Sequence, residues 1–191
     1  MTVEIVPATA ARFDDLAQIL SPNGNDRVCW CLSYRLTSGE FNALKDEQRP
    51  ERMRRLTERD TAPGVIAYVD GEPAGWCGFG PREEMGRLQR SRTIQQLDDM
   101  PVWSVVCFVV KSGFRRRGIA RAMLDAASEY ARAHGAPALE AYPIDPSGGR
   151  VSAAFAFVGT TSMFEAAGFE RVEQTSAKSA GMPRWIVWKT V

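Results

Sequence analysis

The hydrophobic and polar residues of the chain are arranged in short segments that predict alternating strands and helices. A β-branched run at residues 3–6 predicts a first strand. After it, Thr9 is a suitable N-cap for an amphipathic helix that ends near Ser21. Residues 41–60 predict a further helix, which Pro50 breaks into two pieces because proline removes a backbone donor. Residues 23–39, between these helices, are rich in turn residues and predict an irregular segment.

The strongest local signal is a β-hairpin. Two apolar runs, residues 65–69 and 74–79, flank the turn dipeptide Asp70-Gly71. A polar stretch at residues 81–100 follows and predicts a long connection with at most a turn of helix. A connection of this length is often functional.

A strand, a helix and a second strand follow the connection. Residues 103–110 are almost continuously apolar and predict a strand buried on both faces, 116–134 predict a helix, and 138–142 predict a parallel strand. The remaining segments predict a short helix closed by Gly168 and two strands, at residues 160–167, 169–173 and 185–188.

Composition adds limits on partners and compartment. The 191 residues are 45% hydrophobic and 25% charged, without a low-complexity linker, so we expect one domain over residues 1–191. The formal charge is only +1, which argues against nucleic acid and an anionic membrane as partners. The longest apolar run is too short for a bilayer, and the N-terminus is unlike a secretory signal. We therefore expect a cytoplasmic protein whose four cysteines are reduced thiols.

The segment with the clearest chemistry is the arginine-rich turn after residues 103–110. Arginines crowd the predicted start of a helix, where the macrodipole disfavours cations, at positions Arg115, Arg116, Arg117 and Arg121. Guanidinium groups, free helix N–H groups and the small residues Gly118 and Ala120 together suit a bound pyrophosphate. A solvated arginine-rich helix start is the alternative. Walker A and dinucleotide-binding glycine motifs are both absent from the sequence.

This turn resembles the signature of the GNAT superfamily of N-acetyltransferases, which is Gln/Arg-x-x-Gly-x-Gly/Ala after a central strand. Residues 115–120, Arg-Arg-Arg-Gly-Ile-Ala, match every specified position. Residues 163–170 are similar to the late helix and Gly-Phe strand start of the family, and the resemblance covers residues 65–172. It implies an α/β fold with a mixed, mostly antiparallel central sheet, helices on both faces and two splayed central strands.

The resemblance also implies a reaction and a set of donor contacts. The chain is expected to be an N-acetyltransferase that moves an acetyl group from acetyl-CoA to a primary amine of a small molecule or polypeptide, without a metal. The donor is expected between the splayed strands and on the arginine-rich turn, at Phe108, Val109, Val110, Arg115, Arg116, Arg117, Gly118, Ile119 and Ala120. A homodimer is left open.

The sequence departs from the family pattern at both acid–base positions. Many relatives have a tyrosine where this chain has Phe164, and some have a glutamate where it has Ser104. A phenyl ring cannot donate a proton, so Tyr142 is an alternative acid. Ser104 can hold a water molecule. The candidate bases are carboxylates on the long connection, Glu83, Glu84, Asp98 and Asp99.

Three interpretations stay open at this stage. The missing tyrosine allows an acyl-CoA-binding protein without transferase activity. An arginine-rich nucleic-acid module at residues 49–59 is weakened by its interleaved acids. Finally, Trp30, Trp76 and Trp103 belong either to an acceptor pocket or to the core, with residues 29–32 as a covering loop.

Overall fold

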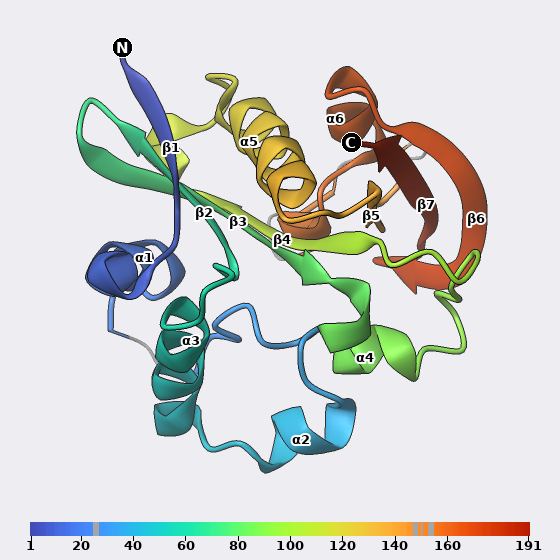
Figure 1. Ribbon diagram of the computed structural model, residues 1–191, viewed down its shortest axis with the longest axis horizontal. Coiled ribbons are helices and arrows are strands. Elements are labelled where there is room, and N and C mark those ends of the chain that lie inside the picture. The colour runs from blue at the N-terminus through green and yellow to red at the C-terminus, as the bar shows by residue number, and fades with distance from the viewer. Residues whose placement is uncertain (25–26, 147–148, 150, 153–154) are drawn as a thin grey trace.

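The computed structural model describes residues 1–24, 27–146, 149, 151–152 and 155–191. These residues contain a seven-stranded sheet in the order β1-β2-β3-β4-β5-β7-β6 (Figure 1). All neighbouring strands are antiparallel except β4 and β5. The strands are β1 (Val3–Pro7), β2 (Gly64–Val69), β3 (Glu72–Pro81), β4 (Trp103–Val110), β5 (Ala138–Ala141), β6 (Glu170–Ser179) and β7 (Met182–Thr190).

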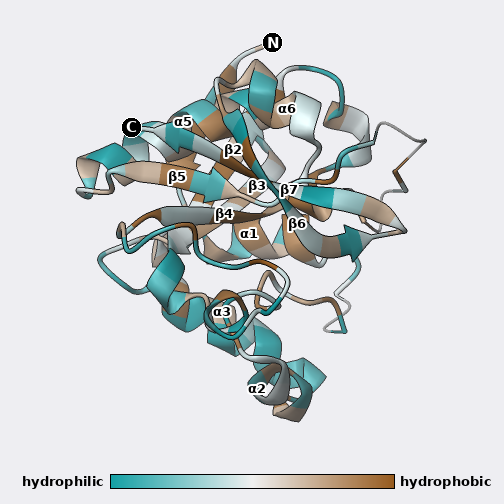
Figure 2. Cartoon of the chain, turned by 90° about the vertical axis from the view of Figure 1, so that its right-hand side faces the viewer, coloured by the Kyte–Doolittle hydropathy of each residue, from teal (hydrophilic) through white to brown (hydrophobic). Residues whose placement is uncertain are grey.

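Helices cover both faces of the sheet and enclose two hydrophobic cores. The helices are α1 (Phe13–Leu20), α2 (Ser38–Ala43), α3 (Arg49–Thr57), α4 (Gly86–Gln89), α5 (Ile119–Ala133) and α6 (Thr161–Ala166). α1 and α3 lie on one side of the central strands, and α5 on the other (Figure 1). Hydrophobic residues concentrate in the interior, along α1 and β4, whereas much of α2 and α3 is hydrophilic (Figure 2). In the described ranges, no helix is long and apolar enough for a membrane crossing.

The structure confirms the predicted α/β architecture and several element positions. The strand predicted at residues 103–110 coincides with β4, and Asp70 and Gly71 both have positive φ, 49° and 84°, as a two-residue hairpin turn requires. The side chain of Thr160 caps α6, and Gly168 closes it with a φ of 85°. These elements follow from local sequence signals.

Other boundaries differ from the predictions. The segment after Thr9 begins as a 3₁₀ turn, and the Thr9 side chain makes no capping hydrogen bond. Pro50 lies in the first turn of α3, where its missing N–H costs nothing, instead of breaking a helix. α5 begins at Ile119 because Gly118 has a left-handed conformation, and β6 and β7 are longer than predicted because they pair as a hairpin.

The feature that positions the site is the separation of β4 from β5. The two strands pair only from Trp103 to Val105 on β4 and from Leu139 to Ala141 on β5. Beyond Val105, no strand of the described residues pairs with the β5-facing edge of β4. The register between β3 and β4 also skips Val106. This β-bulge lies next to Val105, where the pairing of β4 with β5 ends. The predicted splay of two central strands is thus present.

Candidate functional site

The open edge of β4 and the start of α5 line a cavity of about 640 Å³, called here the donor cavity. This volume is typical of a small-molecule site. Every predicted donor contact lines it except Arg117. Met163 and Ala166 of α6 and the side chain of Phe157 complete the wall. The cavity therefore joins the splayed strand to the arginine-rich turn.

The turn into α5 is shaped for close approach of a ligand. Gly118 is the N-cap of α5 with a φ of 78°, and Arg116 also has a left-handed φ of 60°. A Cβ added at Gly118 would meet no atom within 4 Å, so the space above this residue is open. The first turn of α5 contains no acidic residue. Its free N–H groups and positive dipole end thus face the donor cavity without a counter-charge.

The arginines of this turn are largely free of acidic partners. In the described part of the chain, Arg115, Arg116 and Arg117 form no ion pair. The Nε of Arg115 donates to the carbonyl of Val110 at 3.1 Å, and the guanidinium of Arg117 lies 5.7 Å from the centre of the Phe114 ring. Within the described residues, Arg116 makes neither a side-chain hydrogen bond nor a cation–π contact, and it lines the donor cavity. The site has the positive charge that a diphosphate needs.

Phe164 belongs to the core beneath this cavity. Its ring is fully buried and meets Phe108 and Phe169 edge to face, at centroid distances of 5.7 and 5.1 Å. The residue at the position of the family's tyrosine thus contributes packing, and its neighbour Met163 reaches the cavity instead.

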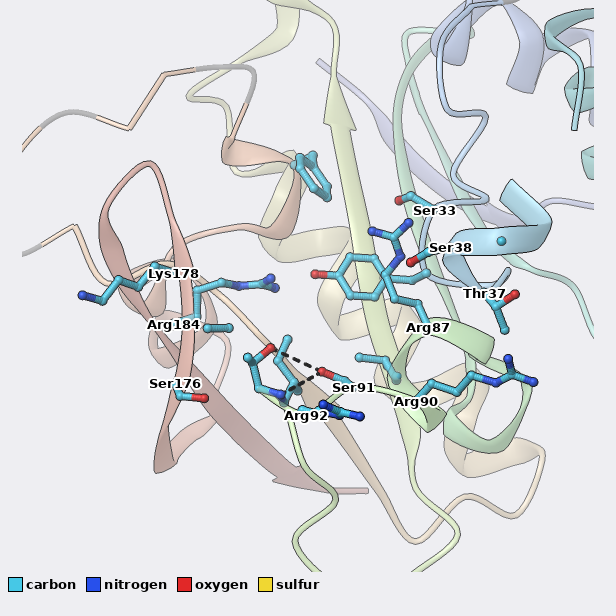
Figure 3. Close-up of a pocket in the computed structure, with 17 residues that line it drawn as sticks. Ser33, Thr37, Ser38, Arg87, Arg90, Ser91, Arg92, Ser176, Lys178 and Arg184 are labelled. Carbon is cyan, nitrogen blue, oxygen red and sulfur yellow. Dashed lines mark hydrogen bonds between the residues drawn. The ribbon is translucent and has the colours of Figure 1, made fainter. Parts of the chain in front are cut away.

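A second cavity of about 760 Å³, called here the basic cavity, lies against the first at Phe157, which lines both. Its walls come from the segment that leads into α2, from α4 and the residues after it, and from the β6–β7 hairpin (Figure 3). Its cationic residues are Arg87, Arg90, Arg92, Lys178 and Arg184. The lining residues that the structure describes include no aspartate or glutamate.

Two of the predicted catalytic residues, Ser104 and Tyr142, meet in a buried polar cluster. Their hydroxyl oxygens are 2.9 Å apart, and Ser104 also donates to Glu140 at 3.2 Å. The phenol of Tyr142 donates to the same carboxylate, and the Nε of Arg82 lies 2.7 Å from it. Burial raises the pKa of Glu140, although Tyr142, Arg82 and Ser104 oppose the shift. Burial and the Glu140 charge raise the pKa of Tyr142 well above its usual value.

This buried cluster supports the basic cavity without lining it. The ring of Tyr142 stacks on that of Tyr34 at 6.4 Å, and Tyr34 does line the cavity. The Nε and Nη2 atoms of Arg184 donate to the Tyr142 carbonyl at 2.8 and 2.5 Å. Tyr142 therefore fixes two residues of the basic cavity.

The predicted carboxylate bases lie elsewhere. Glu84 accepts two hydrogen bonds from Arg59, at 2.7 and 2.8 Å, which lower its pKa. Glu83 and Asp99 line a separate cavity beside His134, at the end of α5 that is about 20 Å from the arginine-rich turn. Asp98 accepts from the N–H of Met100. None of these four lines the donor or the basic cavity.

The tryptophans and the arginines of α3 have structural partners. Trp30, Trp76 and Trp103 are buried and line neither the donor nor the basic cavity. In α3, Arg49 pairs with Asp46 and Arg55 with Glu51. The three tryptophans therefore belong to the core, and these paired arginines do not form a free phosphate-binding face.

Several residues around the site were missed at the sequence level. Arg82, Arg87, Arg90 and Arg92 stand in the connection from which only the acids were chosen as candidates, and the four bases there equal the four acids in number, so a count of charges would not have singled them out. Glu140 alternates with the apolar Leu139 and Ala141, a pattern that marks a polar inner face of β5. No sequence signal identifies Arg184.

Comparisons with known proteins agree with this geometry. The family model described as the acetyltransferase (GNAT) family matches residues 31–155. No curated protein matches the chain. The fold is similar to that of a GNAT-family acetyltransferase from Streptococcus pneumoniae, with 17% identity, a TM-score of 0.58, and coverage of 100% of this chain and 99% of that one.

Two further solved structures share the fold. The PaiA N-acetyltransferase of Thermoplasma acidophilum, solved with coenzyme A, has 12% identity, a TM-score of 0.56 and full coverage of both chains. The ribosomal-protein-alanine N-acetyltransferase of Brucella melitensis has 20% identity, a TM-score of 0.57 and coverage of 98% and 99%. With the splayed strands, the arginine-rich turn and the match over residues 31–155, the chain belongs to the GNAT family, the acetyltransferases that use acetyl-CoA as donor.

Proposed function

We propose that this enzyme acetylates a primary amine of a small molecule, with acetyl-CoA in the donor cavity and the amine in the basic cavity. The observation that carries the proposal is that the two cavities are neighbours, because Phe157 lines both. Each cavity has the volume of a small-molecule site. A second cavity beside the donor cavity provides room for an acceptor, which a protein that only binds acyl-CoA does not require.

The residues of the donor cavity fit acetyl-CoA. The unpaired edge of β4 at Phe108, Val109 and Val110 offers backbone groups to an extended amide-containing arm, as to an added strand. Arg115, Arg116 and the N–H groups at the start of α5 suit the diphosphate. When bound, acetyl-CoA supplies an activated acetyl thioester. The chain holds and orients it, and an N–H of the β4 edge stabilises charge on the carbonyl oxygen.

The basic cavity also favours the neutral form of an amine. Like charges disfavour protonation, so the cations that project into the cavity, Arg87 and Arg184, lower the pKa of an ammonium group that enters. This effect supplies the free amine without a carboxylate base in the cavity, and the proton passes to water. Glu83 and Glu84 have no part in this scheme, since neither lines the cavity.

The departing thiolate needs a proton, and Tyr34 is our candidate donor. The proton that the amine nitrogen loses as the amide forms then returns through water to the Tyr34 phenolate. It lines the basic cavity, whereas the Tyr142 phenol is committed to Glu140 and Ser104 in the buried cluster. Ser104 and Tyr142 then act as positioning residues, because they hold Tyr34 and Arg184 in place.

The test is release of free coenzyme A thiol from acetyl-CoA in the presence of a broad panel of primary amines. We expect amine-dependent release for at least one class, together with a product one acetyl group heavier by mass spectrometry. A reaction without amine corrects for hydrolysis. If calorimetry shows acetyl-CoA binding but every amine leaves the thioester intact, the proposed amine acetylation is wrong.

A further inference from the structure

We infer that the acceptor is a small anionic amine, a molecule that carries a carboxylate or phosphate beside its reactive amine, and that Arg87 and Arg184 bind this anionic group. The inference rests on the proposed function and names the substrate class of the basic cavity. It depends on the charge, the partners and the placement of the residues that line this cavity.

The charge of the basic cavity is out of proportion to that of the chain. The whole sequence has a formal charge of only +1, yet five cations line this one cavity and no described lining residue is acidic. None of the five forms an ion pair within the described ranges, whereas Arg49, Arg59 and Arg171 elsewhere are paired. Clustered cations without counter-ions repel one another, and a bound anion removes that repulsion.

Arg87 and Arg184 are placed to bind an anion directly. They project into the cavity from opposite walls, Arg87 from α4 and Arg184 from β7, while Lys178 points outward at the edge (Figure 3). Arg184 is only 8% exposed, and its anchor on the Tyr142 carbonyl uses one side of the guanidinium. Arg87 lines the cavity and forms no ion pair with the residues that the structure describes. Guanidinium groups donate paired hydrogen bonds to a carboxylate or phosphate, so these two arginines suit an anion.

The phosphates of the donor do not account for this charge. The arginines suited to the diphosphate, Arg115 and Arg116, line the donor cavity, and Phe157 is the sole residue common to the described linings of the two cavities. The basic cavity is therefore a second anion site on the acceptor side.

The same features exclude other acceptor classes. A polyamine or an aminoglycoside would bring several positive charges among five cations, with no carboxylate to receive them. Hydroxyl groups of Ser33, Ser91 and Ser176 line the walls and can donate to further oxygens of an anion. A volume of about 760 Å³ accommodates a small molecule.

The inference can be tested with matched amines at saturating acetyl-CoA. The carboxylate arm compares β-alanine with propylamine, the phosphate arm compares O-phosphoethanolamine with ethanolamine, and putrescine represents the polycations. We expect kcat/KM to be at least about tenfold higher for the anionic member in one arm or both, because a charge-assisted contact distinguishes the two. The arm with the larger ratio identifies carboxylate or phosphate as the natural group.

Two variants test whether the basic cavity causes the preference for anionic over neutral amines. Arg87→Gln removes a guanidinium that forms no ion pair within the described residues, so the fold should be retained, and the anionic preference should fall by about tenfold through a higher KM. Arg52→Gln makes the same charge change on the exposed face of α3 and should leave the preference unchanged. Neutral amines acetylated as well as anionic ones would overturn the inference and leave the proposed function intact. Acetyl-CoA binding with no acetylation of any amine would overturn both.

Discussion

Arg82 and Glu140 form an ion pair in the interior of the protein, with 2.7 Å between the Arg82 Nε and the Glu140 Oε1. The two residues are 4% and 1% exposed. They lie at the level where β4 and β5 are still paired, and the carboxylate also accepts from Ser104 and Tyr142. The ion pair therefore belongs to the buried polar cluster, which lies where β4 and β5 are last paired before they separate.

Removal of the carboxylate should be strongly destabilising. The variant Glu140→Leu leaves the Arg82 guanidinium buried without its counter-charge, and we expect a loss of about 3–5 kcal/mol in the free energy of unfolding. The double variant Arg82→Met with Glu140→Leu removes both charges and should recover most of this loss. Urea denaturation measures both. A Glu140→Leu protein as stable as the parent would contradict the ion pair.

Two adjacent residues of the arginine-rich turn, Arg116 and Arg117, should differ in their effect on coenzyme A binding. Arg116→Glu places a negative charge in the donor cavity and should weaken coenzyme A binding by more than about tenfold. Arg117→Glu makes the same change beside the Phe114 ring, outside the cavity lining, and should weaken binding by less than about threefold. Calorimetric titration with coenzyme A checks both variants. Equal effects would mean that long-range charge, not contact, determines affinity.

The predicted donor contacts come together in one cavity, apart from Arg117, because the signals behind them are local. The apolar run of β4, the turn and the first residues of α5 are contiguous, so one stretch of 13 residues, 108–120, contains every predicted donor contact. The conformation at Gly118 and the missing acids in the first turn of α5 are also properties of consecutive residues. Arg117 does not line the cavity, because the left-handed turn at Arg116 and Gly118, before α5 begins, determines which arginine faces it.

The acceptor side could not be predicted in this way, because its residues meet only in the folded chain. Arg87 and Arg184 come from segments nearly a hundred residues apart, α4 and β7, and line one cavity. The partner of Arg82 is Glu140, on a different element from the acids next to it in sequence. Their position in the long connection made Glu83 and Glu84 candidate bases in the sequence analysis. In the folded chain, Glu84 accepts hydrogen bonds from Arg59 instead.

The roles of the two stacked tyrosines can be separated by removing each hydroxyl. Tyr142→Phe leaves the buried Glu140 with one donor fewer, so we expect about 1–3 kcal/mol less stability and a kcat within a few-fold of the parent. Tyr34→Phe should keep stability and lower kcat about a hundredfold, since it removes the proposed proton donor. Steady-state rates and urea unfolding give both quantities. A large loss of kcat in Tyr142→Phe, with little loss in Tyr34→Phe, would identify Tyr142 as the group that protonates the thiolate.

The buried thiol pair Cys31 and Cys107 predicts a dependence of stability on pH. A hydrogen bond from Cys107 lowers the pKa of Cys31 to about 7, against the effect of burial and with help from the positive charge of Arg35. The pKa of Cys107 rises well above its usual value because it shares this hydrogen bond with Cys31. The pair therefore loses its first proton near neutrality.

A thiol whose pKa is lower in the folded than in the unfolded protein stabilises the fold above the unfolded value of 9.0, and this contribution is lost as pH falls through about 7. The free energy of unfolding should therefore rise from pH 7 to pH 9 in the parent. Cys31→Ser should remove this rise, whereas Cys77→Ser should preserve it, because burial keeps the pKa of the Cys77 thiol well above its usual value. Urea unfolding at several pH values measures the slope, and an unchanged slope in Cys31→Ser would show that another group produces it.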